Sequence, residues 1–183
     1  EYDVIIFSDV EGKLFQLAPG FFIKEKFGKE ILTFPDRIKL TTEAVKKGKG
    51  LMMLGGWYSF TGELGKGGWG RTNLKHILPV ECLNHEDLVE STEGYYPKVT
   101  EEGKKTFFES EFDKIPPILG YNQTKIIPEG KILLTIEETG DPLLALRKVG
   151  KGNILAYTSD PAPHWGLNFV YWNNYNNFWL KCL

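Results

Sequence analysis

Two short apolar segments constrain the fold of this chain more than any other feature. Within them, apolar and polar residues do not alternate. Residues 3–8 (DVIIFS) and 51–54 (LMML) have the pattern of strands that are buried on both faces of a sheet. Between them, residues 36–47 have the apolar spacing of a helix, with Asp36 placed to cap its start and Gly48 to end it. This strand–helix–strand order predicts a right-handed crossover between two parallel strands.

The second half of the chain has a different pattern. Residues 131–160 contain three apolar runs, separated by EETGDP and VGKGN, which are turn signals too short to hold helices. We therefore expect an antiparallel meander whose last strand covers 154–158. Beyond it, large side chains recur every three or four positions, which predicts one helix packed on the sheet. The residues of this stripe are Phe169, Trp172, Tyr175, Phe178, Trp179 and Cys182.

The segment from 83 to 117 is polar. A short amphipathic helix is expected within residues 100–112, through Phe107, Phe108 and Phe112. We expect the rest of this segment to form loops or an edge strand.

Length and composition narrow the classes of function. The 183 residues suit a single domain with room for a core. The net charge of −2 shows no basic excess, so nucleic acid is not an expected partner, and no apolar run is long enough for a membrane span. The two cysteines, Cys82 and Cys182, form no disulfide framework, so we expect a reducing, cytoplasmic location.

The strand at 51–54 leads into a glycine-rich loop at 55–70, which is the kind of loop that cradles a phosphate or displays a nucleophile. Neither common phosphate motif is present, because Gly67 follows Lys66 where a P-loop needs serine or threonine, and G-x-G-x-x-G is absent. A nucleophile elbow would carry serine or cysteine close to the strand end. Ser59 comes a few positions late for that role.

Among the three histidines, His164 is the strongest candidate for a site. It lies in TSDPAPHWG, directly after the last predicted strand, where two prolines restrict the backbone. Sites in open α/β sheets form at such strand ends. Cys82 and His85 form a C-x-x-H pair without a second pair, so we predict no metal site, and no cofactor is expected.

Together these segments resemble the putative glutamine amidotransferase-like family, a group of cytoplasmic proteins related to class I glutamine amidotransferases. The resemblance rests on YDVIIFSD, GLMMLGGWYSFTGELGKGGWG, PPILGYN and TSDPAPHWG, and it spans most of the chain. It implies a flavodoxin-like, three-layer α/β sandwich with a mostly parallel sheet and the antiparallel C-terminal meander. It also implies a strand–helix–strand unit before YDVIIFSD, so residues 1–183 are expected to be one domain that lacks this first unit.

The glutaminase chemistry of the related enzymes does not follow from the resemblance. Glutamine amidotransferases carry a cysteine nucleophile on this elbow and a histidine that is followed two residues later by glutamate. Here the elbow at 54–58 reads LGGWY, and Gly166 stands two residues after His164. Since losing such a nucleophile costs on the order of 10⁶ in rate, we expect no glutaminase activity.

Three hypotheses for the function stay open. The chain could bind a small metabolite or sugar between the loops at 55–70 and 159–166, through Gly55, Gly56, Trp57, Tyr58, Phe60, Trp69, Ser159 and Trp165. It could instead be a hydrolase, with His164, Asp160 and Ser59 as catalytic residues. It could also be an assembly domain of a homo-oligomer, with the aromatic loop as its interface.

Overall fold

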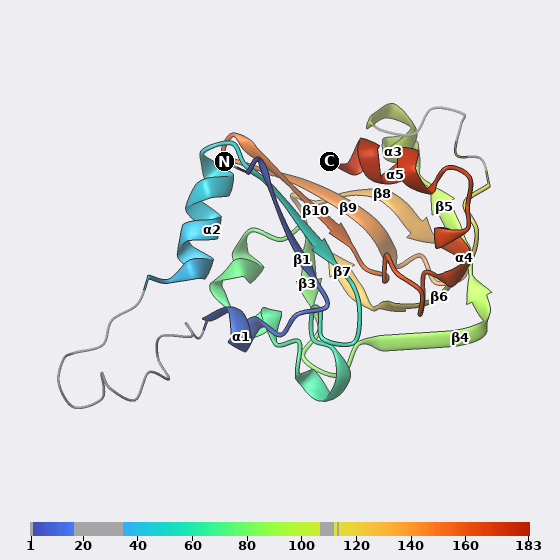
Figure 1. Cartoon of the computed structure of the whole chain (residues 1–183), viewed down its shortest axis with the longest axis horizontal. Coiled ribbons are helices and arrows are strands. Elements are labelled where there is room, and N and C mark those ends of the chain that lie inside the picture. The colour runs from blue at the N-terminus through green and yellow to red at the C-terminus, as the bar shows by residue number, and fades with distance from the viewer. Residues whose placement is uncertain (1, 17–34, 107–111, 113) are drawn as a thin grey trace.

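The computed structural model describes residues 2–16, 35–106, 112 and 114–183, and it has a mixed six-stranded sheet at its centre (Figure 1). Strands β1, β2 and β10 are parallel neighbours, whereas β10, β9, β8 and β5 each pair antiparallel with the next. In their order across the sheet the strands are β1 (Val4–Ser8), β2 (Gly50–Leu54), β10 (Gly152–Tyr157), β9 (Pro142–Val149), β8 (Lys131–Ile136) and β5 (Pro97–Val99).

Helix α2 (Arg37–Lys46) connects β1 to β2, as the sequence predicted. The Asp36 carboxylate caps it by accepting hydrogen bonds from the backbone N–H groups of Ile38 and Lys39, at 3.0 Å each. Ile38 and Val45 are buried against the sheet. The helix between the two parallel strands therefore begins at a capping residue that the sequence identifies, and it packs on the sheet through an apolar face.

Strand β2 separates two hydrophobic clusters because its side chains alternate between the faces of the sheet. Leu51 and Met53 pack with α2 in one cluster. Met52 and Leu54 belong to the other cluster, which includes aromatic side chains of the C-terminal helices. Burial on both faces explains why the LMML segment shows no alternation of polar and apolar residues.

The C-terminal aromatic stripe forms two helices, α4 (Leu167–Val170) and α5 (Tyr175–Cys182), and not the single helix that its spacing predicted. The break covers residues 171–174 and includes Asn173 and Asn174, a residue type of low helix propensity. Phe169 and Phe178 are nevertheless buried on the sheet, at 5.0 Å between ring centroids. The spacing thus identified the buried face correctly and missed the interruption.

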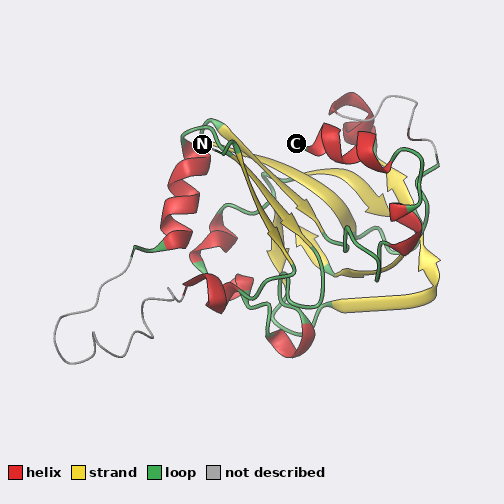
Figure 2. Cartoon of the chain, in the orientation of Figure 1, coloured by secondary structure: helices red, strands yellow, loops and turns green. Residues whose placement is uncertain are grey.

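Smaller elements surround the sheet (Figure 2). The helix expected within 100–112 is α3 (Glu101–Thr106); residues 107–111 lie outside the described part of the chain, and Phe112 is buried. Two strand pairs, β3 with β7 and β4 with β6, lie apart from the main sheet. The remaining elements are α1 (Gly12–Gln16), β3 (Val80–Cys82), β4 (Leu88–Tyr95), β6 (Ile118–Asn122), β7 (Thr124–Ile126) and short 3₁₀ turns at Glu63–Gly65, Trp69–Arg71 and Asn73–His76. Among the described residues, no helix has the length and apolar character needed to cross a bilayer.

Candidate functional site

The three parallel strands end side by side, and their following residues meet at one edge of the sheet. Ser8 is in register with Leu54, and Tyr157 is in register with Leu54 from the other side. The loops after β2 and β10 are joined by the Gly55 N–H, which donates to the carbonyl oxygens of Tyr157 and Ser159 at 2.8 and 3.0 Å. Carboxyl ends of parallel strands are where α/β proteins form their sites.

The elbow after β2 has no room for a nucleophile at its two glycines. A Cβ atom on Gly55 would collide with the backbone carbonyl oxygen of Thr158, the residue that directly follows β10. Gly56 has a φ of +146°, and a Cβ atom there would lie 2.5 Å from Oδ1 of Asp9. The first elbow side chain that projects outward is therefore that of Trp57, which is 42% exposed.

A buried network beneath this loop holds its shape. Asp87 is 1% exposed, and its carboxylate accepts hydrogen bonds from the N–H groups of Thr61 and Gly62, at 2.9 Å each. The Asn122 side chain donates to Asp87 at 2.9 Å and accepts from the Gly56 N–H at 2.9 Å. Burial raises the pKa of Asp87, and the hydrogen bonds it accepts oppose that shift.

Glu90, on β4, ties the two loops together at the rim of the edge. Its Oε1 atom accepts hydrogen bonds from the indole N–H groups of Trp57, at 3.2 Å, and Trp165, at 2.7 Å. The His164 ring stacks on Trp165 at 5.3 Å and meets the Trp57 ring edge-on at 5.0 Å between centroids. One carboxylate thus fixes two indoles on either side of an imidazole that is 41% exposed.

Two carboxylates flank the His164 ring. Its Nε2 lies 3.8 Å from Oε1 of Glu90, and its Nδ1 lies 3.8 Å from Oδ2 of Asp160. Both separations exceed a direct hydrogen bond. Asp9, with a φ of +45°, accepts a hydrogen bond from the Tyr58 N–H at 2.6 Å. The edge is consequently acidic, with Glu90 and Asp160 beside the imidazole and Asp9 at the neighbouring strand end.

The environment of Asp160 predicts a measurable pH dependence of stability. Burial raises the pKa of Asp160 and the charge of Asp9 adds to the shift, whereas the Ala162 N–H and His164 oppose it. Its stabilising contribution is then fully present below an unfolded-state pKa of about 3.9 and is lost as the pH rises through the folded-state value. Chemical denaturation across this range should show that Asp160→Asn removes part of the decline. An identical decline in both proteins would contradict the assignment.

Several residues that the sequence proposed for this site lie in the interior. The Ser59 hydroxyl is 1% exposed and donates to the carbonyl of Leu54 at 2.6 Å. The Ser159 hydroxyl donates to the carbonyl of Gly120 at 2.7 Å, again in a buried position. Phe60 and Trp69 belong to the hydrophobic cluster under α2. These four side chains support the loops from within and offer no surface to a ligand.

The structure brings the other proposed residues together. Trp57, Asp160 and His164 surround the junction of the two loops. Trp165 is only 1% exposed, so it supports the His164 ring from within and offers little surface to a ligand. Tyr58 is half-buried, with its ring beneath the Lys66 ammonium at 5.6 Å.

Neither cysteine can replace the missing nucleophile at neutral pH. Burial raises the pKa of both Cys82 and Cys182 to about 12, so each remains a thiol. Among the described residues, no group of three histidine, cysteine, aspartate or glutamate side chains is arranged to hold a metal ion.

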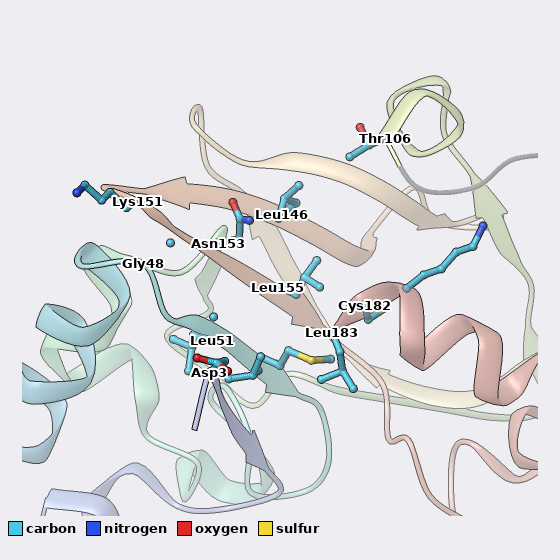
Figure 3. Close-up of a pocket in the computed structure, with 15 residues that line it drawn as sticks. Asp3, Gly48, Leu51, Thr106, Leu146, Lys151, Asn153, Leu155, Cys182 and Leu183 are labelled. Carbon is cyan, nitrogen blue, oxygen red and sulfur yellow. The ribbon is translucent and has the colours of Figure 1, made fainter. Parts of the chain in front are cut away.

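A hollow of about 290 Å³ opens beside His164 and belongs to this candidate site. It is lined by Glu90, Ser91, Thr92, Leu119, His164 and Trp165. A larger hollow of about 490 Å³ lies at the amino ends of the same strands, between Gly50, Asn153 and Cys182 (Figure 3). Its lining combines sheet side chains such as Leu146 and Leu155 with the end of α5, without the clustered carboxylates and imidazole. We therefore place the candidate site beside His164.

Sequence reasoning did not propose Asp9, Glu90, Asp87 or Asn122. Asp9 had a usable signal, because it directly follows the first predicted strand, which is parallel to β2, and so had to lie at the same edge as Gly55. Glu90 had no such signal, since it lies in a polar strand outside the main sheet. Its place became apparent only from the pairing of β4 with β6, which brings it against both loops.

Comparison with solved structures finds two cytoplasmic proteins of Salmonella typhimurium. One has 32% sequence identity and a TM-score of 0.88, and the other, from strain LT2, has 34% and 0.86; each match covers 99% of this chain and 70% of the other. A β-galactosidase from Rahnella sp. R3 matches 86% of this chain and 20% of its own, at 13% identity and a TM-score of 0.50, which indicates a shared fold alone.

Comparison with curated proteins finds no match. The family described as putative glutamine amidotransferase matches residues 1–183. The mixed α/β sheet, with its site edge at the parallel strand ends, agrees with a glutamine amidotransferase-like fold. The chain belongs to this putative glutamine amidotransferase family.

Proposed function

We propose that this chain is a flavodoxin-like α/β domain that binds a small, uncharged polar metabolite, with neutral sugars as the first candidates, and that it is not a glutaminase. The observation that carries the proposal is the Glu90 carboxylate, which holds the indoles of Trp57 and Trp165 around His164. Such a fixed arrangement of aromatic and polar groups is typical of a preformed ligand site.

The chemistry of the edge supports a neutral ligand. Carboxylates accept hydrogen bonds from hydroxyl groups, and an indole offers an apolar surface to the C–H faces of a sugar ring. Glu90 and Asp160 supply the acceptors, and Trp57 is the exposed aromatic residue. Among the described residues, neither lysine nor arginine lines the hollow beside His164, so an anionic ligand would meet carboxylates without a matching cation.

A hydrolase that uses His164 to activate water is a second candidate. Its support is the position of the imidazole, 3.8 Å from a carboxylate on each side. Catalytic hydrogen bonds are often long before the substrate binds, so these distances are compatible with a base oriented by Asp160. Ser59 has no part in this version, because its hydroxyl is buried and bonded to the Leu54 carbonyl. Since the matched Salmonella proteins are described as cytoplasmic, we propose the same location for this chain.

A thermal-shift screen tests the binding proposal. The probes are glucose, galactose, mannose and trehalose, each applied to the wild type, to His164→Ala and to His85→Ala as a control at another exposed histidine. We expect at least one sugar to raise the melting temperature of the wild type and of His85→Ala, and to have little effect on His164→Ala. Equal stabilisation of all three proteins would remove His164 from the site.

Glutaminase activity should be absent. We expect no ammonia release from glutamine above the uncatalysed background, because Gly55 and Gly56 leave no space for a nucleophile and both cysteines remain protonated. A coupled glutamate dehydrogenase assay measures this directly. Turnover in the wild type would contradict the account, and a Cys82→Ala/Cys182→Ala variant would then show whether a thiol is responsible.

A further inference from the structure

A third hollow, of about 310 Å³, lies beside the glycine-rich loop, and three basic side chains line it. Lys13 and Gln16 reach it from α1, and Lys66 and Arg71 reach it from the loop. Among the described residues, no carboxylate lines this hollow. Its charge is therefore opposite to that of the edge beside His164.

The Arg71 guanidinium is available to a ligand. In the described part of the chain it makes neither a side-chain hydrogen bond nor an ion pair, and the side chain is exposed. Among the described residues, a Cβ atom on Gly65 would meet Nη2 of Arg71 alone, at 3.7 Å, so the guanidinium lies over the backbone of this glycine. Gly65 has a φ of +72°, which disfavours a side chain at this position.

The two lysines have partners outside the hollow. Lys66 lies 3.2 Å from Glu63, and Lys13 lies 2.8 Å from Glu11. These pairs leave donors free, because an ammonium group has three N–H bonds and surface ion pairs are weak. The Lys66 ammonium also lies over the Tyr58 ring, at 5.6 Å from its centroid.

The loop offers an anion its side chains, because its backbone N–H groups are already hydrogen-bonded. The N–H groups of Gly65, Lys66 and Gly68 already donate to the carbonyl oxygens of Gly62, Glu63 and Thr61. These internal hydrogen bonds agree with the absence of a P-loop motif, in which free backbone N–H groups would surround the anion. An anion in this hollow would therefore be bound by a guanidinium and ammonium groups.

We propose that this hollow binds the phosphate group of a small phosphorylated metabolite, at a site separate from the edge beside His164. A guanidinium matches two phosphate oxygens with its planar fork, and lysines add point charges. The hollow is also large enough for more than an inorganic phosphate ion, since small-molecule sites begin at roughly 300 Å³. The glycine-rich loop would then separate two sites of opposite charge.

Isothermal titration with glucose 6-phosphate tests this proposal, with inorganic phosphate, glucose and sodium chloride at matched ionic strength as further arms. We expect saturable binding of glucose 6-phosphate that weakens at least about 10-fold in Arg71→Gln, because charge-assisted hydrogen bonds contribute about 1.5–3 kcal/mol. Lys125→Gln is the matched control, since it removes one exposed positive charge on β7. It should change the affinity less than 2-fold.

The different titrants show which chemical group is responsible for any binding that is measured. Binding of inorganic phosphate alone, as tightly as glucose 6-phosphate, would restrict the site to the free ion and overturn the metabolite part of the proposal. Absence of saturable binding for both phosphate probes, or equal losses in Arg71→Gln and Lys125→Gln, would overturn the site. Trp57→Ala should leave phosphate binding unchanged, so failure of the sugar site and failure of this site are distinguishable.

Discussion

Replacing Gly55 by alanine is expected to lower the free energy of unfolding by about 3 kcal/mol, because overpacked positions cost about 1–3 kcal/mol and this one meets backbone. The new Cβ atom would collide with the Thr158 carbonyl oxygen and lie 2.8 Å from Oδ1 of Asn122. The backbone directly after β10 would have to move, and the hydrogen bond from the Gly56 N–H to the Asn122 side chain would be disturbed as well. Urea denaturation followed by circular dichroism measures the change.

Gly140→Ala is the control for this substitution. Gly140 has a φ of +77°, but beyond its two chain neighbours no described residue comes within 4 Å of the position that its Cβ atom would take. Gly140→Ala should therefore lose only the free energy needed to hold alanine in a left-handed backbone conformation, which is about 1 kcal/mol. Equal losses in the two variants would show that crowding at the elbow is not what excludes a side chain.

Asp87→Asn is expected to cost about 2 kcal/mol, because a buried donor left without an acceptor carries a penalty of about 1–3 kcal/mol. The carboxylate accepts hydrogen bonds from three donors, namely the N–H groups of Thr61 and Gly62 and the side-chain amide of Asn122. An asparagine has one oxygen, so its NH₂ group would face one of these donors. Thermal and urea denaturation should both detect the loss.

Glu86→Gln serves as the control, since Glu86 is an exposed neighbour whose carboxylate accepts a hydrogen bond from the Leu64 N–H at 2.9 Å. We expect a change below about 0.5 kcal/mol, as for most surface substitutions. If Asp87→Asn were as stable as Glu86→Gln, the buried network would not be what holds the glycine-rich loop.

The parts of the fold that depend on local patterns were predictable from the sequence. The strand at 51–54 is buried on both faces, as its lack of alternation predicted. The same prediction was wrong for residues 3–8, because β1 lies at the edge of the described sheet, where Phe7 is buried and Ile6 is 49% exposed. Asp36 and Gly48 mark the ends of the helix between the two strands, as predicted. The interruption between α4 and α5 was not predicted, because the periodicity of aromatic residues continues across Asn173 and Asn174. Spacing reports which face is buried and is insensitive to a short break in the backbone.

The sequence predicted where in the fold the candidate site lies, but it predicted only some of the residues that form it. The rule for parallel strand ends brought the loops of Trp57 and His164 to one edge. It could not tell which aromatic residues of the glycine-rich loop face outward, and Phe60 and Trp69 are in the core. Nor could it find Glu90, whose role depends on long-range packing of β4 against both loops.

The elbow glycines connect the sequence to the proposed function. At Gly55 and Gly56 the space that a side chain would need is taken by Thr158 and Asp9. The absence of a cysteine is thus built into the packing of three neighbouring strand ends. Trp57 is the side chain that the elbow presents instead, and it contacts His164.

Tryptophan fluorescence during titration with the sugar that stabilises the protein tests the central claim most directly. Trp57 is 42% exposed beside His164, so its emission should respond when a ligand covers it. We predict a saturable change in the wild type that is retained in Trp179→Phe, a control on α5, and lost in Trp57→Phe. The same change in Trp57→Phe, or no saturable change in the wild type with any of the four sugars, would contradict the claim.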